Sequence, residues 1–306
     1  MIRRAAHSAA VAIGRVAARM LPDRVPVTFV GAGSVAELCA AIGGQGRTRV
    51  LVVTDRVLVE LGIVETVTDA LRAAGVDAVV YDAIEPDPTF AQVEGGHLQA
   101  TAWGCDAVLA VGGGSPIDAA KMIAAMASNG GDLGRLEGKL KVRRATAPLY
   151  AIPTTAGTGS EVTIAAVVSD TASHQKKFFL DPKLLPSMAA LDPTLMVGIP
   201  GPVTAATGMD ALTHAVESYL SRTSTPQTEA YARHAVRLVF DHLPRAFDEG
   251  TDLDARQGMA LASYYAGLAF TRTSVGFVHA IAHNLGAFYG TPHGLANALV
   301  LPHVLE

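Results

Sequence analysis

Short apolar runs alternate with amphipathic segments along the first two thirds of the chain. The runs at residues 49–55, 105–115 and 147–153 consist mostly of aliphatic residues, as buried strands do, and the second ends in a glycine loop. Residues 58–75 and 116–128 have the periodicity of helices. Because strands that alternate with helices form parallel sheets, the pattern predicts a doubly wound parallel β-sheet, an α/β fold.

The pattern changes after about residue 198. Residues 199–208 resemble a linker, and the sequence that follows has the periodicity of helices only. We therefore predict an N-terminal extension at residues 1–24, an α/β domain at 25–198 and an all-α domain at 199–306. Residues 1–23 carry four arginines and would fit a transit peptide or a membrane-surface helix. We favour an amphipathic helix that packs on the body or frays.

Composition narrows the class of protein. Half of the 306 residues are hydrophobic and 17% are charged, which predicts folded domains rather than a disordered chain. The net charge of −4 gives no reason to expect nucleic acid as a partner. Cys39 and Cys105 are too few for a disulfide framework, so we expect a reducing compartment, the cytoplasm. No apolar run reaches the length of a membrane span, so we expect no membrane partner.

Histidines gather near the end of the chain. His279 and His283 are four positions apart, so they share one face of a helix, and His293 follows a turn that can fold it back toward them. Asp210 and His214 have the same spacing. One carboxylate and several imidazoles form a ligand set for a divalent transition metal. The alternative is that these are core or surface residues, and spacing alone does not decide which of the five would bind.

Three consecutive glycines at residues 112–114 join a predicted strand to a predicted helix. Glycines let the backbone approach a ligand, and a helix N-terminus offers N–H groups to a pyrophosphate. The alternative is a structural turn in which Ser115 and Asp118 form a helix cap. We favour phosphate binding, because three glycines cost more backbone entropy than a turn requires.

A second loop, at residues 153–161, combines glycines with hydroxyl side chains. The hydroxyls belong to Thr154, Thr155, Thr158 and Ser160. Two such loops after two strands suit a dinucleotide. Asp55 ends another predicted strand, where a carboxylate can bind ribose hydroxyls and repel a 2′-phosphate, which favours NAD over NADP. Arg56 weakens that inference, and capping of a helix is the alternative role for Asp55.

Four motifs in order make the chain, from about residue 27 to its end, resemble the iron-containing (group III) alcohol dehydrogenases. The motifs are GGGSPIDAAK, PTTAGTGSEVT, GMDALTHAVESY and VHAIAHNLGAFYGTPHG. The resemblance implies the dehydroquinate synthase-like fold of that family. In this fold a dinucleotide-binding α/β domain precedes an all-α domain, and the cleft between them holds metal and nicotinamide.

The resemblance also implies roles for individual residues. It makes the metal ligands Asp210, His214, His279 and His293. It places His283 close to the nicotinamide and substrate, where the residue would relay a proton or only pack beside the cofactor. The cofactor-binding residues that it implies are Asp55, Gly112, Gly113, Gly114, Ser115, Asp118, Thr154, Thr155, Thr158 and Lys176, the last in preference to Lys177.

The implied activity is metal-dependent transfer of a hydride between a primary alcohol, or an aldehyde, and NAD. Fe(II) is the usual metal of the family, and Zn(II) or another divalent ion would satisfy the same ligands. A homodimer that forms through the first strand, near residues 27–30, is implied as well.

Two departures from the family keep alternatives open. The chain stops at Glu306, whereas family members continue through further helices, so we predict a truncated helical domain. A truncated chain could bind NAD without turnover. The second departure is the arginine-rich N-terminal extension, for which the resemblance implies no role. The alternatives within the superfamily are glycerol dehydrogenase-like, maleylacetate reductase-like and transhydrogenase-like enzymes, and dehydroquinate synthase-like lyases.

Overall fold

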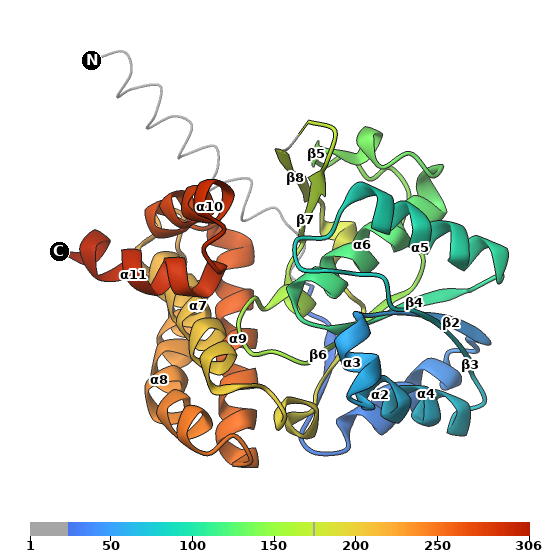
Figure 1. Cartoon of the computed structure of the whole chain (residues 1–306), viewed down its shortest axis with the longest axis horizontal. Coiled ribbons are helices and arrows are strands. Elements are labelled where there is room, and N and C mark those ends of the chain that lie inside the picture. Colours follow the sequence, from blue (N-terminus) through green and yellow to red (C-terminus); the bar gives the residue numbers. More distant parts are fainter. Residues whose placement is uncertain (1–23, 174) are drawn as a thin grey trace.

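The computed structural model describes residues 24–173 and 175–306. The extension predicted from sequence, apart from Arg24, lies outside the described residues. An α/β part and a helical part lie side by side (Figure 1). The last strand ends at Leu191, and the first long helix of the helical part begins at Gly201. In the described ranges, no helix has the length and apolar character needed to cross a membrane.

Six parallel strands form the main sheet, which confirms the predicted doubly wound fold. Their order across the sheet is β1 (Val27–Val30), β9 (Met188–Leu191), β6 (Leu149–Pro153), β4 (Ala107–Gly112), β2 (Arg49–Val53) and β3 (Asp77–Tyr81). Strands β4 and β6 are hydrogen-bonded neighbours in the middle of the sheet. Because the two strands are parallel, the loops that follow them leave the sheet at the same edge.

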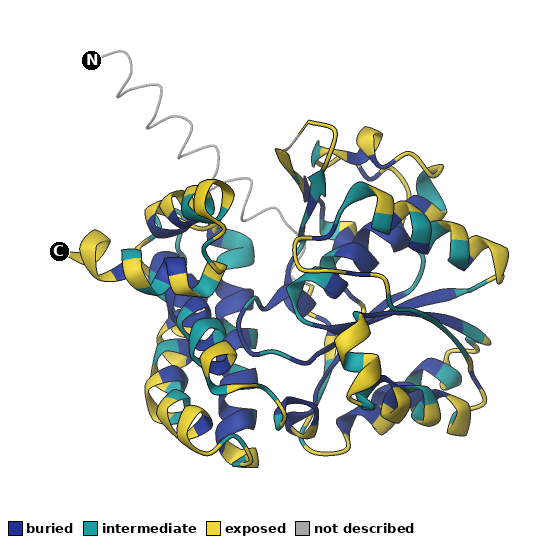
Figure 2. Cartoon of the chain, viewed as in Figure 1, coloured by how far each residue is buried: buried dark blue, intermediate teal, exposed yellow. Residues whose placement is uncertain are grey.

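Helices cover both faces of this sheet (Figure 1). They are α2 (Ser34–Gly44), α3 (Arg56–Glu60) and α4 (Ile63–Ala73) on one face, and α5 (Phe90–Ala102) and α6 (Gly114–Asn129) on the other. Val50 and Val52 of β2 pack toward α2 and α4, whereas Leu51 and Val53 pack toward α6. Both faces of the strand are therefore buried (Figure 2), which explains its uninterrupted apolar sequence.

The helix predicted over residues 58–75 is wrong as a single element. The structure has two helices there, α3 and α4, and the chain turns between them at Gly62. Gly62 has φ of 74°, in the left-handed region that residues with a β-carbon disfavour. Apolar periodicity continues through the turn, because both helices pack on the same face of the sheet, and it therefore conceals the break.

A small second sheet was not predicted. Its strands, in spatial order, are β5 (Gly138–Lys139), β8 (Gln175–Leu180) and β7 (Ala165–Asp170). β7 and β8 pair antiparallel. The two lysines of β8 interrupt its apolar pattern, and only Phe179 of this strand is buried. The sequence therefore gave no strand signal there.

Five helices build the helical part, and the linker predicted at residues 199–208 is wrong. The helices are α7 (Gly201–Leu220), α8 (Pro226–Asp248), α9 (Leu253–Thr273), α10 (Phe277–Tyr289) and α11 (His293–Leu305). Pro202 lies in the first turn of α7, where a missing N–H costs nothing. A β-carbon on Gly208 would lie 2.4 Å from Cδ1 of Leu243, so this glycine permits the close packing of α7 on α8.

Candidate metal centre and nucleotide loops

One face of α7 carries three buried polar residues. Asp210, His214 and Glu217 lie at positions i, i+4 and i+7, and their exposed fractions are 3%, 6% and 7%. These spacings correspond to about one and two helical turns, so the three side chains project from the same side of the helix. α10 and α11 pack against α7 and bring further polar side chains to this face.

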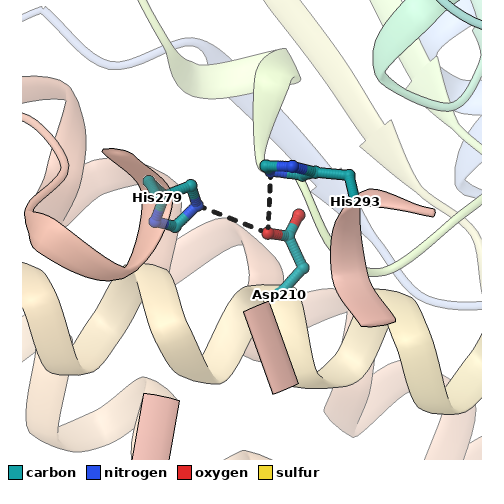
Figure 3. Close-up of side chains that lie close together, drawn as sticks. All are labelled: Asp210, His279 and His293. Carbon is teal, nitrogen blue, oxygen red and sulfur yellow. Dashed lines mark ion pairs between the residues drawn. The ribbon is translucent and has the colours of Figure 1, made fainter. Parts of the chain in front are cut away.

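Asp210 meets one histidine from each of these two helices (Figure 3). Its Oδ1 lies 3.4 Å from Nε2 of His279 on α10 and 3.4 Å from Nε2 of His293 at the start of α11. One ligand atom from each of the three residues lies within 4.8 Å of the others. Ligand atoms bound at about 2.1 Å around a tetrahedral ion are about 3.4 Å apart, so this arrangement fits a single divalent metal.

His214 lies beside this group. Its ring is stacked between Phe270 and His279, with ring centroids 4.2 and 4.4 Å away, and its Nδ1 is 3.9 Å from Oδ2 of Asp210. The Nδ1 atom is buried and has no hydrogen-bond partner among the described residues. A buried polar atom without a partner is costly, and a metal ion would supply one.

His283 borders the group on its outer side. Its ring is stacked on that of His293, with centroids 5.2 Å apart, and lies 6.0 Å from the ring of His279. The ring of Phe178 on β8 is 6.4 Å away, so a strand of the α/β part reaches this side of the helical part. His283 is half-buried.

Charge and burial set the protonation of the group. Burial opposes the charged form of Asp210, but His214, His279 and His293 outweigh it and hold the pKa of this carboxyl below its ordinary value. Burial also opposes a charge on His279, but Asp210 and Glu217 raise its pKa to about 9. Burial lowers the pKa of His214 to about 3, so this ring is neutral at pH 7. An ionised carboxylate and a neutral imidazole are the forms that bind metal. A bound cation would replace one of the two protons that the charged ring of His279 carries.

Two residues of the cluster were missed in the sequence. Glu217 accepts or shares a hydrogen bond of 2.7 Å with Nδ1 of His279. Asn297 on α11 donates a hydrogen bond of 2.7 Å from Nδ2 to Oδ1 of Asp210. Helical spacing could have identified both, because Glu217 lies two turns after Asp210 and Asn297 one turn after His293.

The two predicted nucleotide loops lie against each other at the edge of the sheet. A β-carbon on Gly113 would be 3.0 Å from Oγ1 of Thr155, and one on Gly114 would be 2.9 Å from Cγ2 of Thr158. This close approach requires glycines, so the packing of the two loops explains why glycine occupies both positions. It also places the threonine hydroxyls of one loop next to the backbone of the other.

The first turn of α6 presents backbone N–H groups that no N-cap side chain covers. The helix begins at Gly114, and Gly113 at its N-cap has no side chain that could cap it. Gly112 has φ of 150°, and its carbonyl accepts a hydrogen bond of 3.0 Å from the N–H of Thr154, which joins the two loops. The N-terminus of a 16-residue helix thus faces the shared edge of β4 and β6, as phosphate-binding helices do.

The alternative in which Ser115 and Asp118 cap this helix is wrong. Ser115 lies inside α6, and its Oγ accepts a hydrogen bond of 3.2 Å from the N–H of Asp87. Asp118 accepts hydrogen bonds from Oγ of Ser160, at 2.6 Å, and from the N–H of Val167, at 2.9 Å. The carboxylate of Asp118 therefore joins α6 to the second loop and to β7.

A buried lysine next to Asp118 was also missed. Lys121 has no exposed surface, and its Nζ donates to Oγ of Ser160 at 2.9 Å, Oγ1 of Thr163 at 3.0 Å and the carbonyl of Ala165 at 2.6 Å. The distance from Nζ to Oδ1 of Asp118 is 3.8 Å. These contacts hold the second loop on α6. The periodicity of α6 places Lys121 on the buried side of the helix, and this pattern could have predicted from the sequence that the lysine is buried.

Two further residues predicted to contact cofactor lie on other elements. The Oδ1 of Asp55 accepts a hydrogen bond of 3.0 Å from an N–H in the first turn of α3, which confirms the alternative capping role. Of the two lysines of β8, Lys176 forms an ion pair of 2.6 Å with Asp87, the partner of Ser115 at the glycine loop. Lys177 instead pairs with Glu137 at 3.4 Å. Lys176 is therefore connected to the glycine loop and Lys177 is not.

Two family models cover most of the chain. One, described as iron-containing alcohol dehydrogenase, matches residues 26–193. The other, described as the C-terminal part of the Fe-containing alcohol dehydrogenase family, matches residues 204–306.

Individual proteins agree with these matches. The NAD-dependent methanol dehydrogenase of Bacillus methanolicus is 41% identical over 279 residues, which are 91% of this chain and 73% of that protein. The 1,3-propanediol dehydrogenase of Citrobacter freundii is 44% identical over 94% of this chain and 75% of its own length. The crystal structure of a 1,3-propanediol oxidoreductase has a TM-score of 0.91 and 42% identity, over 93% of this chain and 75% of that chain. A sulfoacetaldehyde reductase from Bifidobacterium kashiwanohense, in complex with NAD⁺, has a TM-score of 0.86 and 32% identity, over 92% and 75% of the two chains.

Proposed function

This chain belongs to the iron-containing alcohol dehydrogenase family, and we propose that Asp210, His214, His279 and His293 hold its catalytic metal. The chain is an NAD-dependent oxidoreductase that transfers a hydride between a primary alcohol, or an aldehyde, and NAD. The convergence of one carboxylate oxygen and two imidazole nitrogens within 4.8 Å is the observation that carries the metal site.

Fe(II) is the metal that we propose, with Zn(II) or another divalent ion as the alternative. The donor set supports either, because oxygen and imidazole nitrogen ligands suit both ions. His214 supplies the fourth ligand from a buried Nδ1 that no hydrogen bond within the described chain satisfies. When bound, the ion acts as a Lewis acid on the oxygen of the alcohol or the aldehyde.

The residues of the α/β part bind and orient NAD in this proposal. The N–H groups at the start of α6 and the hydroxyls of the adjoining loop hold the pyrophosphate and the groups next to it. The N–H groups and hydroxyls belong to Gly112, Gly113, Gly114, Ser115, Thr154, Thr155 and Thr158, and Asp118 of α6 is the remaining residue proposed to bind the cofactor. Asp55 lies two residues after β2, where Oδ2 can accept from a ribose hydroxyl while Oδ1 caps α3. Lys176 contacts the cofactor from β8.

We assign His283 the role of proton relay. It is half-buried and stacks on His293 at the outer side of the metal group, between the ligands and the ring of Phe178 on β8. An imidazole in this position can accept the alcohol proton and pass it outward.

Assembly and location are proposed on separate grounds. We propose a homodimer, because β1 is an edge strand whose Val27 and Val30 are 61% and 50% exposed, and such an edge can pair with a second copy. We propose the cytoplasm because both cysteines are free thiols. We propose the division into an α/β domain at residues 25–198 and a helical domain at 199–306, because no strand follows β9 in the described chain.

Metal content and turnover test the site together. Protein purified without oxygen is loaded with Fe(II) or Zn(II), its bound metal is measured, and NADH formation is followed with a panel of primary alcohols. We expect one metal ion per chain and alcohol-dependent NADH formation that a chelator abolishes. Turnover that persists at full rate after the metal is removed would contradict the proposed metal site.

A further inference from the structure

Glu217 connects two helices at the back of the metal group. It lies on α7, two turns after Asp210, and its side chain is buried against the N-terminus of α10. The resemblance to the family gave this residue no role, and it does not contact the position where the three ligand atoms converge.

The carboxylate of Glu217 has three hydrogen-bond partners at the start of α10. Its Oε2 accepts from the N–H of Gly276 at 2.7 Å, and its Oε1 accepts from the N–H of Val278 at 2.6 Å. Oε2 also lies 2.7 Å from Nδ1 of His279. Gly276 is the N-cap of α10 and has no side chain to satisfy these donors. The helix is therefore capped from outside by α7, with a charge of the sign that a helix N-terminus favours.

These contacts determine which nitrogen of His279 faces the ligands. An ionised carboxylate can only accept a hydrogen bond, so Nδ1 of His279 must carry the proton in this contact. In the neutral ring, the lone pair then lies on Nε2, the atom that is 3.4 Å from Oδ1 of Asp210. Nδ2 of Asn297 lies 3.3 Å from the same Nε2, and an amide N–H next to it suits a lone pair there.

We propose that Glu217 is a positioning residue that fixes the tautomer and the orientation of His279 for metal binding. This inference rests on the proposed function. Two of its bonds hold the backbone that carries His279, and the third holds the ring, so one carboxylate sets both the place and the direction of the ligand atom. The fit is tight, because a β-carbon on Gly276 would lie 2.8 Å from Oε1 of Glu217. Carboxylates behind metal-bound histidines raise metal affinity in this way in other proteins.

The test compares Glu217→Gln with a variant that loses a helix cap elsewhere. Thr225 caps α8, a helix that carries none of the proposed metal ligands, because its Oγ1 accepts a hydrogen bond from the N–H of Thr228. Thr225→Ala is therefore the control for the loss of a cap. The affinity for Zn(II) is measured by competition with a chelator, and the affinity for NAD is measured on the same samples. We expect Glu217→Gln to bind Zn(II) about 10- to 100-fold more weakly with unchanged NAD affinity, and Thr225→Ala to bind both as wild type does.

A second measurement needs no variant. In the zinc-loaded wild-type protein, long-range ¹H–¹⁵N spectra of the histidine rings report which nitrogen carries the proton. We expect His279 to hold its proton on Nδ1 and the metal on Nε2. A metal on Nδ1, or zinc affinity in Glu217→Gln equal to that of wild type, would overturn the role of Glu217 and leave the metal site standing. A wild-type protein that binds no metal would overturn both proposals.

Discussion

The cluster around Lys121 in the α/β part and the cluster around Asp210 in the helical part are both buried and charged, but they differ in how their polar atoms are satisfied. All three protons of the Lys121 ammonium go to oxygen acceptors within the chain. In the Asp210 cluster, Nδ1 of His214 and Oδ1 of Asn297 have no partner in the described part of the chain, and three ligand atoms converge. Burial of charge alone therefore does not identify a binding site.

The difference separates a structural network from a ligand site. Lys121 and Asp118 hold the second nucleotide loop on α6, and each proton of the Lys121 ammonium has an acceptor within the chain. Asp210 and its histidines hold their ligand atoms at the spacing of a metal shell. Glu217 lies behind His279, and Nδ2 of Asn297 lies 2.7 to 3.3 Å from the three ligand atoms themselves. Satisfied networks fix a conformation, whereas convergent ligand atoms beside a buried nitrogen without a partner are typical of a metal site.

The largest expected effect follows the removal of a ligand. His279→Ala should abolish tight metal binding and lower kcat/KM by at least about 1000-fold, because a Lewis acid contributes several kcal/mol to the barrier. His303→Ala, an exposed histidine of α11, serves as the control and should keep both. Metal analysis and steady-state kinetics measure the two quantities, and persistence of both in His279→Ala would remove this residue from the ligand set.

Removal of the charge from the other cluster should affect stability instead. Lys121→Met leaves the buried Glu161 and the half-buried Asp118 without their cation, so we expect the free energy of unfolding to fall by about 3 kcal/mol. Metal content of the folded protein should not change. Lys139→Met, at an exposed lysine of β5, is the control. Urea unfolding combined with metal analysis checks the result, and a loss of metal without a loss of stability would reverse the comparison.

Glu161, next to Lys121, should make the free energy of unfolding depend on pH. Burial raises the pKa of this carboxyl from 4.5 to about 7. Between these pH values the folded protein binds more protons than the unfolded chain, so the free energy of unfolding falls as pH rises, by at most about 3 kcal/mol. Its contribution is complete below pH 4.5. Unfolding curves at pH 5 and pH 8 measure this fall. We expect Glu161→Gln to remove it, whereas Glu94→Gln, at an exposed position, should leave it unchanged. The same fall in wild type and both variants would argue against the role of Glu161.

A smaller effect is expected where the nucleotide loops meet. The β-carbon of Gly114→Ala would lie 2.9 Å from Cγ2 of Thr158, so the two loops must separate by a few tenths of an ångström. We expect the affinity for NAD to fall about tenfold, or ~1.4 kcal/mol, without loss of metal. Gly44→Ala adds a β-carbon that meets nothing within 4 Å and is the matched control. Fluorescence titration with NADH measures both; equal affinities would mean that this loop contact does not shape the cofactor site.

The smallest change concerns the choice of cofactor. Asp55→Asn keeps an oxygen that can cap α3 but loses the charge that would repel a 2′-phosphate. We expect the ratio of NADP to NAD use to rise about fivefold, equal to ~1 kcal/mol. The ratio of kcat/KM values for the two cofactors measures this. An unchanged ratio would leave Asp55 with its capping role alone.

Local sequence determined the central strands of the main sheet, most of its helices and most of the candidate chemistry. Apolar runs gave the strands β2, β4 and β6 because both faces of the sheet are covered, and periodicity gave the helices because each packs on one side. The spacing of Asp210 and His214, and of His279 and His283, predicted correctly which faces of their helices carry the candidate ligands. These features depend on residues within a few turns of one another, which is why a pattern could reveal them.

Only the tertiary structure decided how these pieces meet. It selected His279 and His293 as the partners of Asp210, and it set Glu217 behind His279, because α7, α10 and α11 pack against one another. It made residues 201–208 of the predicted linker part of α7, since Gly201 and Gly208 permit close packing on α8. Hydrogen bonds between residues far apart in the chain depend on the packing of whole elements, and no local pattern contains that information.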